Sequence, residues 1–251
     1  MMSQKKFARA IRKFCVCLTP ALFLSQIPQA FAQQSASPIS KYGGQLVMTT
    51  NSDPKSFNDI IAKETSTTEI TDYIFEGLTS IDPFSLKVIP HLAESWDVSN
   101  DGLTWTFHLR KNVLWNDGAP FGADDVVFTF NDLIYNPDIA SSARDIFTID
   151  EKPFKVEKID AYTVKFTLPV RFAPFLRGMG QAILPKHELQ KYVETKKFNT
   201  AWGLDTNPRE IVGTGPYKLF KYTPGERIIL ARNGRYWKKS EAGEQLPISK
   251  K

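Results

Sequence analysis

The stretch from His91 to Leu133 constrains the fold of this chain more than any other, because it specifies a β-hairpin followed by a helix. Apolar and polar residues alternate from Leu103 to Leu109, and a period of two is typical of a strand with one buried face. A shorter run, Glu94 to Val98, precedes it, and Asn-Asp-Gly separates the two runs. Asp-Gly between such runs is a strong hairpin signal, so we predict that Gly102 has a positive φ.

A helix is predicted from Ala123 to Leu133, because apolar residues recur there at helical spacing, namely Val126, Phe130, Leu133 and Ile134. Gly122 can occupy the N-cap position. Asp124 and Asp125 in the first turn suit the positive end of the helix dipole. A second Asp-Gly pair predicts that Gly118 turns the chain, again with a positive φ, between the hairpin and this helix.

Residues 1–32 have the three parts of a secretory signal peptide: a basic start, an apolar run and an Ala30-Phe31-Ala32 cleavage site. The alternative is a membrane anchor, but the apolar run is interrupted and too short for a bilayer. Both cysteines, Cys15 and Cys17, lie in this leader. The exported chain would therefore contain no disulfide.

The basic pI of the full sequence belongs to the leader. Five of the 32 basic residues lie in residues 1–32, which leaves 27 basic residues to balance 27 acidic ones. A formally neutral chain gives no reason to expect a nucleic-acid partner.

Other elements follow from local patterns. We expect a first strand over Gly44 to Thr50, and a capping box, Ser66 to Glu69, that opens a helix ended by Gly77. A second strand pair is expected over 155–159 and 162–168. A short helix is expected within 172–179 and another after Pro185. A tight turn at 213–216 should lead into a strand pair over 217–222 and 227–232.

No enzyme or metal motif is evident. The three histidines, His91, His108 and His187, are not at metal-ligand spacing, so no metal site is predicted. Neighbouring Asp124 and Asp125 point about 100° apart on a helix and cannot form a facing acid–base pair. No nucleophile elbow is present, and the Gly213-Thr214-Gly215 turn lacks the lysine of a phosphate loop.

Four blocks carry a resemblance to a known family, in order PHLAESWDVSNDGLTWTFHLRK (90–111), NDGAPFGADDVVFTF (116–130), GTGPYKL (213–219) and ERIILARNGRYW (226–237). The sequence resembles the family 5 extracellular solute-binding proteins, the peptide-binding receptors of ABC importers. The resemblance runs from about Gly44 to Pro247 and covers only the N-terminal half of that longer family.

The resemblance implies an α/β fold with mixed sheets, a lobe like that of type II periplasmic binding proteins with a smaller lobe inserted in it. Carried over, residues 1–32 are the signal peptide and 33–43 a linker. Residues 44–61 with 183–237 form the incomplete first lobe, and residues 62–182 form the inserted lobe. Residues 238–251 are a polar tail, and nothing is expected to pack in its last six residues, Leu246 to Lys251. The opposite lobe would follow the present C-terminus.

The resemblance also implies a function: capture of a solute, most simply an oligopeptide, in the periplasm and its delivery to the membrane permease of an ABC importer. Relatives take peptides, nickel complexes, opines or sugars. The protein would act as a monomer, without a cofactor and without catalysis. Expected ligand-binding residues lie in two loops and contribute mostly backbone contacts: Asn51, Ser52, Asp53 and Pro54 in the first, and Gly213, Thr214 and Gly215 in the second.

Two alternatives stay open. One is a non-functional or incomplete gene product, for which the DNA beyond codon 251 is the deciding observation. If the opposite lobe is absent, the chain should bind peptide poorly by itself, since small-ligand sites normally bury most of the ligand. The other alternative is a secreted hydrolase that uses scattered carboxylates, which an assay of Asp124 and Asp125 variants would separate from a binder.

Overall fold

The computed structural model describes residues 44–247, so the predicted leader, the linker and the last four residues lie outside the described part. Its largest sheet has four strands in the order β3-β4-β8-β7. The predicted hairpin is confirmed: β3 (Ala93–Val98) pairs with β4 (Thr104–Leu109). Gly102 turns between them with a φ of 71°, and Gly118 has a φ of 106°, both positive as predicted.

The second predicted strand pair is also confirmed, as β7 (Lys155–Asp160) and β8 (Thr163–Thr167). Because β8 also pairs with β4, two hairpins distant in sequence join into one sheet. On one face of this sheet the side chains of Phe107, Val164 and Phe166 are fully buried. This agrees with their alternation with polar residues along the strands.

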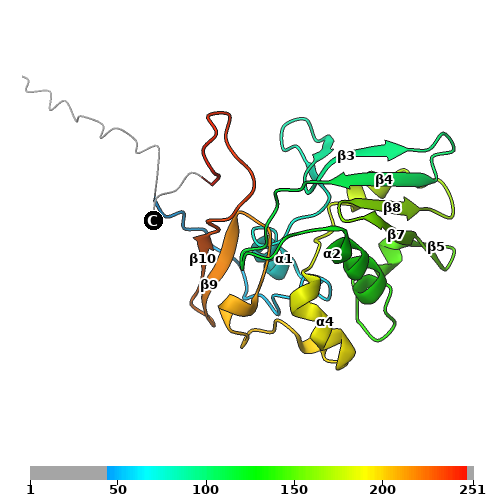
Figure 1. Ribbon diagram of the computed structural model, residues 1–251. Helices are drawn as coiled ribbons and strands as arrows, with labels where there is room; N and C mark the ends of the chain where they lie inside the picture. Colours follow the sequence, from blue (N-terminus) through cyan, green and yellow to red (C-terminus); the bar gives the residue numbers. More distant parts are fainter. Residues whose placement is uncertain (1–43, 248–251) are drawn as a thin grey trace, which may run out of the picture. The chain divides into compact units, whose positions relative to one another are not determined.

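The predicted helix after Gly122 forms in two parts. α2 (Ala123–Val127) begins at Gly122 as its N-cap and continues directly into a π-helical segment, η1 (Phe128–Ile134). α2 lies against β7 and β8, two neighbouring strands of the four-stranded sheet (Figure 1). The four apolar residues predicted to face the core are all fully buried: Val126, Phe130, Leu133 and Ile134.

Smaller elements complete the described part. Three two-stranded sheets are β1 (Thr79–Ile81) with β2 (Val88–Pro90), β5 (Thr148–Ile149) with β6 (Lys152–Pro153), and β9 (Tyr217–Thr223) with β10 (Arg227–Arg232). The remaining helices are α1 (Thr65–Thr71), η2 (Arg144–Phe147), α3 (Phe175–Gly178), α4 (Lys186–Glu194), η3 (Phe198–Thr200) and η4 (Pro208–Glu210). The mixture of helices and several sheets is confirmed, although every strand pair among the described residues is antiparallel.

Three local predictions are wrong. Residues 44–50 do not form a strand; no strand of the described part pairs with them, and Leu46 and Val47 are 83% and 76% exposed. A strand needs a hydrogen-bonded neighbour. α1 begins after Glu64 without a side-chain cap, so the capping box at Ser66 is not used. It ends at Thr71, well before Gly77.

The described residues of the polar tail, 238–247, are joined by hydrogen bonds, so the expectation that nothing packs at its end is wrong for Leu246. Lys239 and Gln245 form an isolated antiparallel β-bridge. The amide of Leu246 donates to the carbonyl of Lys238 at 3.0 Å. The side chain of Gln245 donates to the carbonyl of Tyr236 at 2.7 Å. These bonds fold the segment into a small hairpin against the residues that precede it.

The core is rich in aromatic rings that meet edge to face. Phe130 contacts Phe147 and Phe166 with ring centres 5.1 and 5.0 Å apart, and Phe175 packs 5.7 Å from Phe166. Such pairs add to the burial energy of each ring. No helix among residues 44–247 is long and apolar enough to cross a bilayer.

Candidate ligand-binding cleft

A cavity of about 400 Å³ lies where four segments of the chain meet, and we call it the Glu76 cleft. Its walls come from the connection between α1 and β1, from β1 itself, from the end of α3 and from residues near the C-terminal end of the described chain. Its polar and titratable side chains include those of Asp72, Glu76, His91, Arg177 and Tyr236.

Two glycines bring the segments close enough to form the cleft. A Cβ atom on Gly77 would lie 2.4 Å from the carbonyl carbon of Gly180, a distance that no side chain tolerates. Gly77 therefore allows a close backbone contact. It does not end a helix, although the sequence had suggested that it would. The amide of Thr79 also donates to the carbonyl of Met179 at 3.2 Å, which holds β1 against α3.

Glu76 is the most constrained polar group of the cleft. Its side chain is almost fully buried, and its two carboxylate oxygens accept one hydrogen bond each. The Tyr236 hydroxyl donates to Oε1 at 2.9 Å, and the Trp237 indole N–H donates to Oε2 at 2.9 Å. Nε2 of His91 lies 3.3 Å from Oε1. A buried carboxylate is stable only with such partners, so this cluster fixes the geometry of the cleft wall.

Burial pulls the two titratable groups of this cluster toward their neutral forms. It raises the pKa of Glu76 from 4.5 to about 7, against the hydrogen bonds from Trp237 and Tyr236. It lowers the pKa of His91 from 6.5 to about 4, and the positive charge of Lys238 lowers it further. Near neutral pH His91 is uncharged, and the population of Glu76 is divided between its neutral and charged forms.

The cleft also offers charges of both signs. Asp72 and Arg177 line it, and neither forms an ion pair with another residue of the described range 44–247. The pKa of Asp72 is raised, first by burial and then by the nearby negative charge of Asp59. Phe75 and Tyr236 supply aromatic wall. This combination of a few polar groups and rings is typical of a small-molecule site.

The first predicted binding loop, Asn51 to Pro54, lies at the far end of β9. Oδ2 of Asp53 accepts hydrogen bonds from the Tyr222 hydroxyl at 2.9 Å and from the amide of Gly225 at 2.7 Å. Asn51, Ser52 and Asp53 are exposed, whereas Pro54 is buried. The loop is therefore tied to the turn of the β9–β10 hairpin, and its role in ligand binding stays a prediction.

The second predicted loop, Gly213 to Gly215, is buried at the opposite end of β9. The carbonyl of Gly213 accepts from the amide of Asn116 at 3.0 Å, and the amide of Gly215 donates to the carbonyl of Ile74 at 2.8 Å. Their backbone groups thus serve the fold, and Pro216 beside them reaches the Glu76 cleft. With β9 between them, about 20 Å of strand separates the two predicted loops. The ligand role of this loop also stays a prediction.

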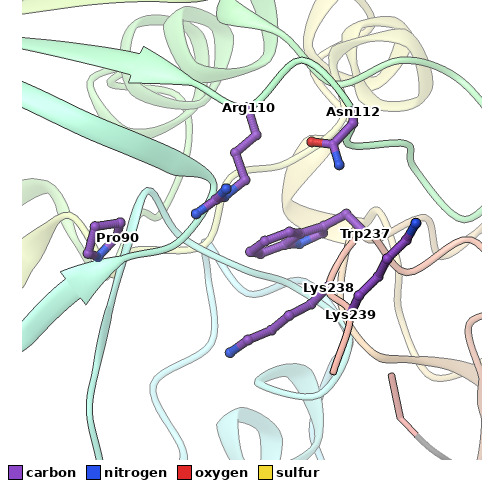
Figure 2. A pocket seen from close by; sticks show the side chains of 6 residues that line it. All are labelled: Pro90, Arg110, Asn112, Trp237, Lys238 and Lys239. Atoms are coloured by element: carbon purple, nitrogen blue, oxygen red, sulfur yellow. The ribbon is translucent and has the colours of Figure 1, made fainter. Parts of the chain in front are cut away.

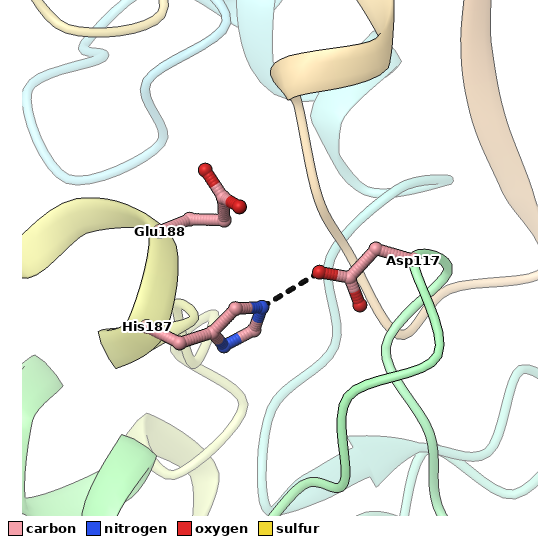
Figure 3. Close-up of side chains that lie close together, drawn as sticks. All are labelled: Asp117, His187 and Glu188. Atoms are coloured by element: carbon pink, nitrogen blue, oxygen red, sulfur yellow. Dashed lines mark hydrogen bonds and ion pairs between the residues drawn. The ribbon is translucent and has the colours of Figure 1, made fainter.

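A cluster that the sequence did not indicate brings Asp117, His187 and Glu188 together, with one ligand atom from each within 4.8 Å of the others (Figure 3). Nε2 of His187 hydrogen-bonds Oδ2 of Asp117 at 2.7 Å, and Glu188 pairs with Lys191 at 3.4 Å. The trio could offer oxygen and nitrogen to a divalent ion. These ion pairs already account for its geometry, so we assign it a structural role.

Asp125 is structural, which removes one carboxylate from the hydrolase alternative. Its Oδ2 accepts from the amide of its N-cap Gly122 at 3.0 Å, and Oδ1 accepts from the amide of Lys186 at 3.0 Å. It therefore caps α2 as predicted and also holds the start of α4. Asp124 is exposed and pairs with Lys158 at 2.7 Å.

Sequence reasoning missed the main side chains of the cleft. Glu76 and Arg177 were not singled out, and His91 was considered only as a metal ligand. Glu76 sits in a segment of helical period, and nothing local marks its partners, which follow 160 and 161 residues later. A usable signal was present: an acidic residue within an otherwise apolar run, Ile74 to Leu78, calls for a buried partner.

Comparison with known proteins explains the architecture. Residues 87–248 match the family described as bacterial extracellular solute-binding proteins, family 5 Middle. The chain belongs to this family. The matched range includes His91, Arg177, Tyr236 and the other cleft residues after β2.

Two curated relatives are peptide-binding proteins by name. The di/tripeptide-binding protein 1 of Pseudomonas aeruginosa is 31% identical over 240 residues, which cover 89% of this chain and 42% of the relative. The dipeptide-binding protein of Escherichia coli is 34% identical over 209 residues, which cover 76% of this chain and 38% of the relative. This chain therefore spans about two fifths of the length of these relatives.

A solved structure of a periplasmic binding protein shows the same fold. The ABC transporter-associated periplasmic binding protein of Helicobacter pylori, in complex with the peptide STSA, superposes with a TM-score of 0.62 and 31% identity. The match covers 75% of this chain and 39% of that one. The type II periplasmic-binding-protein fold predicted from the sequence is thus confirmed. The division of this chain into two lobes at residues 62 and 182 stays a prediction.

Proposed function

We propose that this family 5 chain contributes to the capture of short peptides outside the inner membrane and to their delivery to an ABC importer. The observation that carries the proposal is the match of residues 87–248 to the family, together with relatives whose names specify dipeptides and tripeptides. The chain spans about two fifths of those relatives, so the peptide class is our proposal for this chain.

The chemistry of the Glu76 cleft supports a peptide ligand. A short peptide carries an ammonium group, a carboxylate and a row of backbone amides. Asp72 and Arg177 supply charges of opposite sign, and the hydroxyl of Tyr236 and the backbone of β1 lie along the same wall. Binding of this kind uses main-chain hydrogen bonds and leaves side chains in roomy pockets, so no covalent step is needed. We accordingly propose a binding protein and not an enzyme.

The predicted leader supports a periplasmic location, since residues 1–32 have the parts of a cleaved signal peptide. A receptor in that compartment would act as a monomer that meets the membrane permease of its importer. Closure about a hinge is the usual way in which such receptors report occupancy.

Ligand-observed NMR tests the ligand class, because it detects binding even when affinity is weak. The purified chain would be mixed with three pools of equal concentration: di- and tripeptides, galactosides, and nickel–histidine complexes. We expect saturation transfer to the peptides and much less to the other pools. Asp72→Asn should weaken the peptide signal, whereas the matched change Asp82→Asn, in an exposed turn outside the cleft, should not. A preference for another pool would overturn the proposal.

A further inference from the structure

A second cavity, of about 430 Å³, lies beside the Glu76 cleft, and we call it the Trp237 pocket (Figure 2). It is lined by Pro90, Arg110, Asn112, Trp237, Lys238 and Lys239. Its residues come from the end of β2, from the segment after β4 and from the start of the small hairpin at the end of the described chain. Its volume is in the range of small-molecule sites.

Every ionisable residue of this pocket is a cation. Arg110, Lys238 and Lys239 line it, no carboxylate does, and none of the three forms an ion pair with another residue of the range 44–247. Positive charges around a pocket that no carboxylate lines favour a bound anion. The positive charge of Lys238 also acts on the neighbouring cleft, where it lowers the pKa of both Glu76 and His91.

Two side chains of the pocket, those of Arg110 and Trp237, are held in place by contacts, whereas Lys238 and Lys239 are exposed. Nε of Arg110 donates to the carbonyl of His91 at 2.6 Å, which fixes the guanidinium group. The centre of that group lies 4.6 Å from the centre of the Trp237 ring system, a cation–π contact. Trp237 is in turn anchored by its hydrogen bond to Glu76. The guanidinium and the indole therefore keep their places before any ligand arrives.

We infer that the Trp237 pocket binds a small organic oxyanion, in which a carboxylate or a phosphate group is attached to an apolar or aromatic body. The oxyanion meets the outer N–H groups of Arg110 and the ammonium group of Lys238, which extend to the same side of the indole in Figure 2, whereas Lys239 extends to the other side and adds positive charge at the rim. The amide of Asn112 can donate a further hydrogen bond. The body of the ligand packs on the exposed part of the Trp237 ring.

The test uses the full chain and follows the indole N–H signal of Trp237 by NMR, assigned through Trp237→Phe. Four probes separate charge from ring: benzoate, phenyl phosphate, inorganic phosphate and neutral benzyl alcohol. We expect benzoate or phenyl phosphate to shift the signal in a saturable way, and benzyl alcohol to leave it unchanged. A response to phenyl phosphate alone assigns a phosphate ligand, and a response to benzoate alone assigns a carboxylate ligand.

Two lysine changes locate the site without touching its rigid wall. The double variant Lys238→Gln, Lys239→Gln should bind the responding anion roughly tenfold more weakly, since it removes two exposed positive charges from the pocket. The control Lys218→Gln, Lys221→Gln removes the same charge from exposed positions on β9 and should bind as the unmodified chain does. Equal weakening in both variants, or unchanged binding in the first, would overturn the inference. So would an equal response to the neutral alcohol.

Discussion

The indole N–H of Trp237 donates a hydrogen bond of 2.9 Å to Oε2 of Glu76, which lies 161 residues earlier in the chain. The same carboxylate accepts a hydrogen bond from the hydroxyl of Tyr236 and lies beside the His91 ring. One buried acid thus joins the α1–β1 connection to the last described segment. Because burial disfavours its charged form, the strength of this junction depends on pH.

Glu76 should destabilise the fold as pH rises. Its pKa is raised from 4.5 in the unfolded chain to about 7 in the folded one, so the folded state holds the proton more tightly. The stabilising contribution is complete below pH 4.5 and is lost as pH rises through about 7. At about 1.4 kcal/mol for each pKa unit, it amounts to roughly 3 kcal/mol.

His91 should act in the opposite direction. Its pKa falls from 6.5 to about 4 on folding, so its contribution is present above pH 6.5 and is lost as pH falls through about 4. The two effects nearly cancel between pH 4.5 and 6.5. We expect His91→Gln to show stability that falls from pH 4.5 to 7, and Glu76→Gln to show stability that rises from pH 4 to 6.5. Urea unfolding at half-unit pH steps measures both. If both variants keep the pH profile of the unmodified chain, the linkage is wrong.

Gly213 should not tolerate a side chain. A Cβ atom there would lie 2.0 Å from the carbonyl oxygen of Ile74, and backbone cannot move aside easily. We expect Gly213→Ala to lower the free energy of unfolding by roughly 3 kcal/mol, at the upper end of overpacking costs. Gly234→Ala is the control, because no atom lies within 4 Å of its Cβ position. It should change stability by less than about 0.5 kcal/mol, and equal losses at both positions would contradict the packing argument.

Asp125 and Asp124 are neighbours with different expected effects. Asp125→Ala removes the acceptor for two backbone amides and for the indole of Trp115, and the amides are left without a partner. The expected loss of stability is roughly 2–4 kcal/mol. Asp124→Ala breaks only an exposed pair with Lys158 and should cost less than about 1 kcal/mol. Thermal unfolding compares the two, and a reversed order would refute the capping role of Asp125.

The turn at Gly102 can be tested at a single position. Its φ of 71° suits glycine, is tolerated by asparagine and strains a β-branched residue. We expect Gly102→Val to cost roughly 1–3 kcal/mol and Gly102→Asn to cost less than half of that. Denaturant midpoints of the three proteins measure the difference. Equal costs for valine and asparagine would show that φ is not what selects glycine here.

The leader prediction concerns residues outside the described range. Export by a secreting bacterial host should remove residues 1–32 after Ala32, and mass spectrometry of the exported protein should then find an N-terminus at Gln33. The control Ala30→Leu, Ala32→Leu replaces the small residues of the cleavage site and should leave the leader attached. An exported chain that still contains Cys15 would refute the prediction.

The sequence predicted the four strands of the main sheet because each has its own local signal. Leu103 to Leu109 alternates, and Asp-Gly dictates the turn before it. The sequence could not predict that residues 44–50 stay unpaired. A strand must form hydrogen bonds with a neighbouring strand, and the local pattern does not reveal whether that neighbour exists. The cleft was beyond reach for the same reason. Glu76 and Trp237 meet only in the fold, and the meeting of Asp117 with His187, 70 positions apart, is equally non-local.

The predicted ligand role of Gly213 and Gly215 comes from the family resemblance, and it stays a prediction. In the structure it is the backbone of Tyr73 and Ile74 that approaches them. A pattern of glycines predicts close contact, but it does not tell whether the partner is a ligand or another segment of the same chain.

The π-helical segment Phe128–Ile134 also bears on how the gene can vary in length. A π-turn holds one residue more than an α-turn, and here the amide of Tyr135 reaches back to the carbonyl of Phe130. Deleting one residue within the segment would restore α-helical bonding, because the extra residue of the π-turn would be gone. Leu133 and Ile134, both fully buried, could then keep their places in the core. Lineages that carry this segment should therefore accept the loss of a single codon here more readily than in a stretch that is already α-helical, where a deletion rotates the residues beyond it by about 100°.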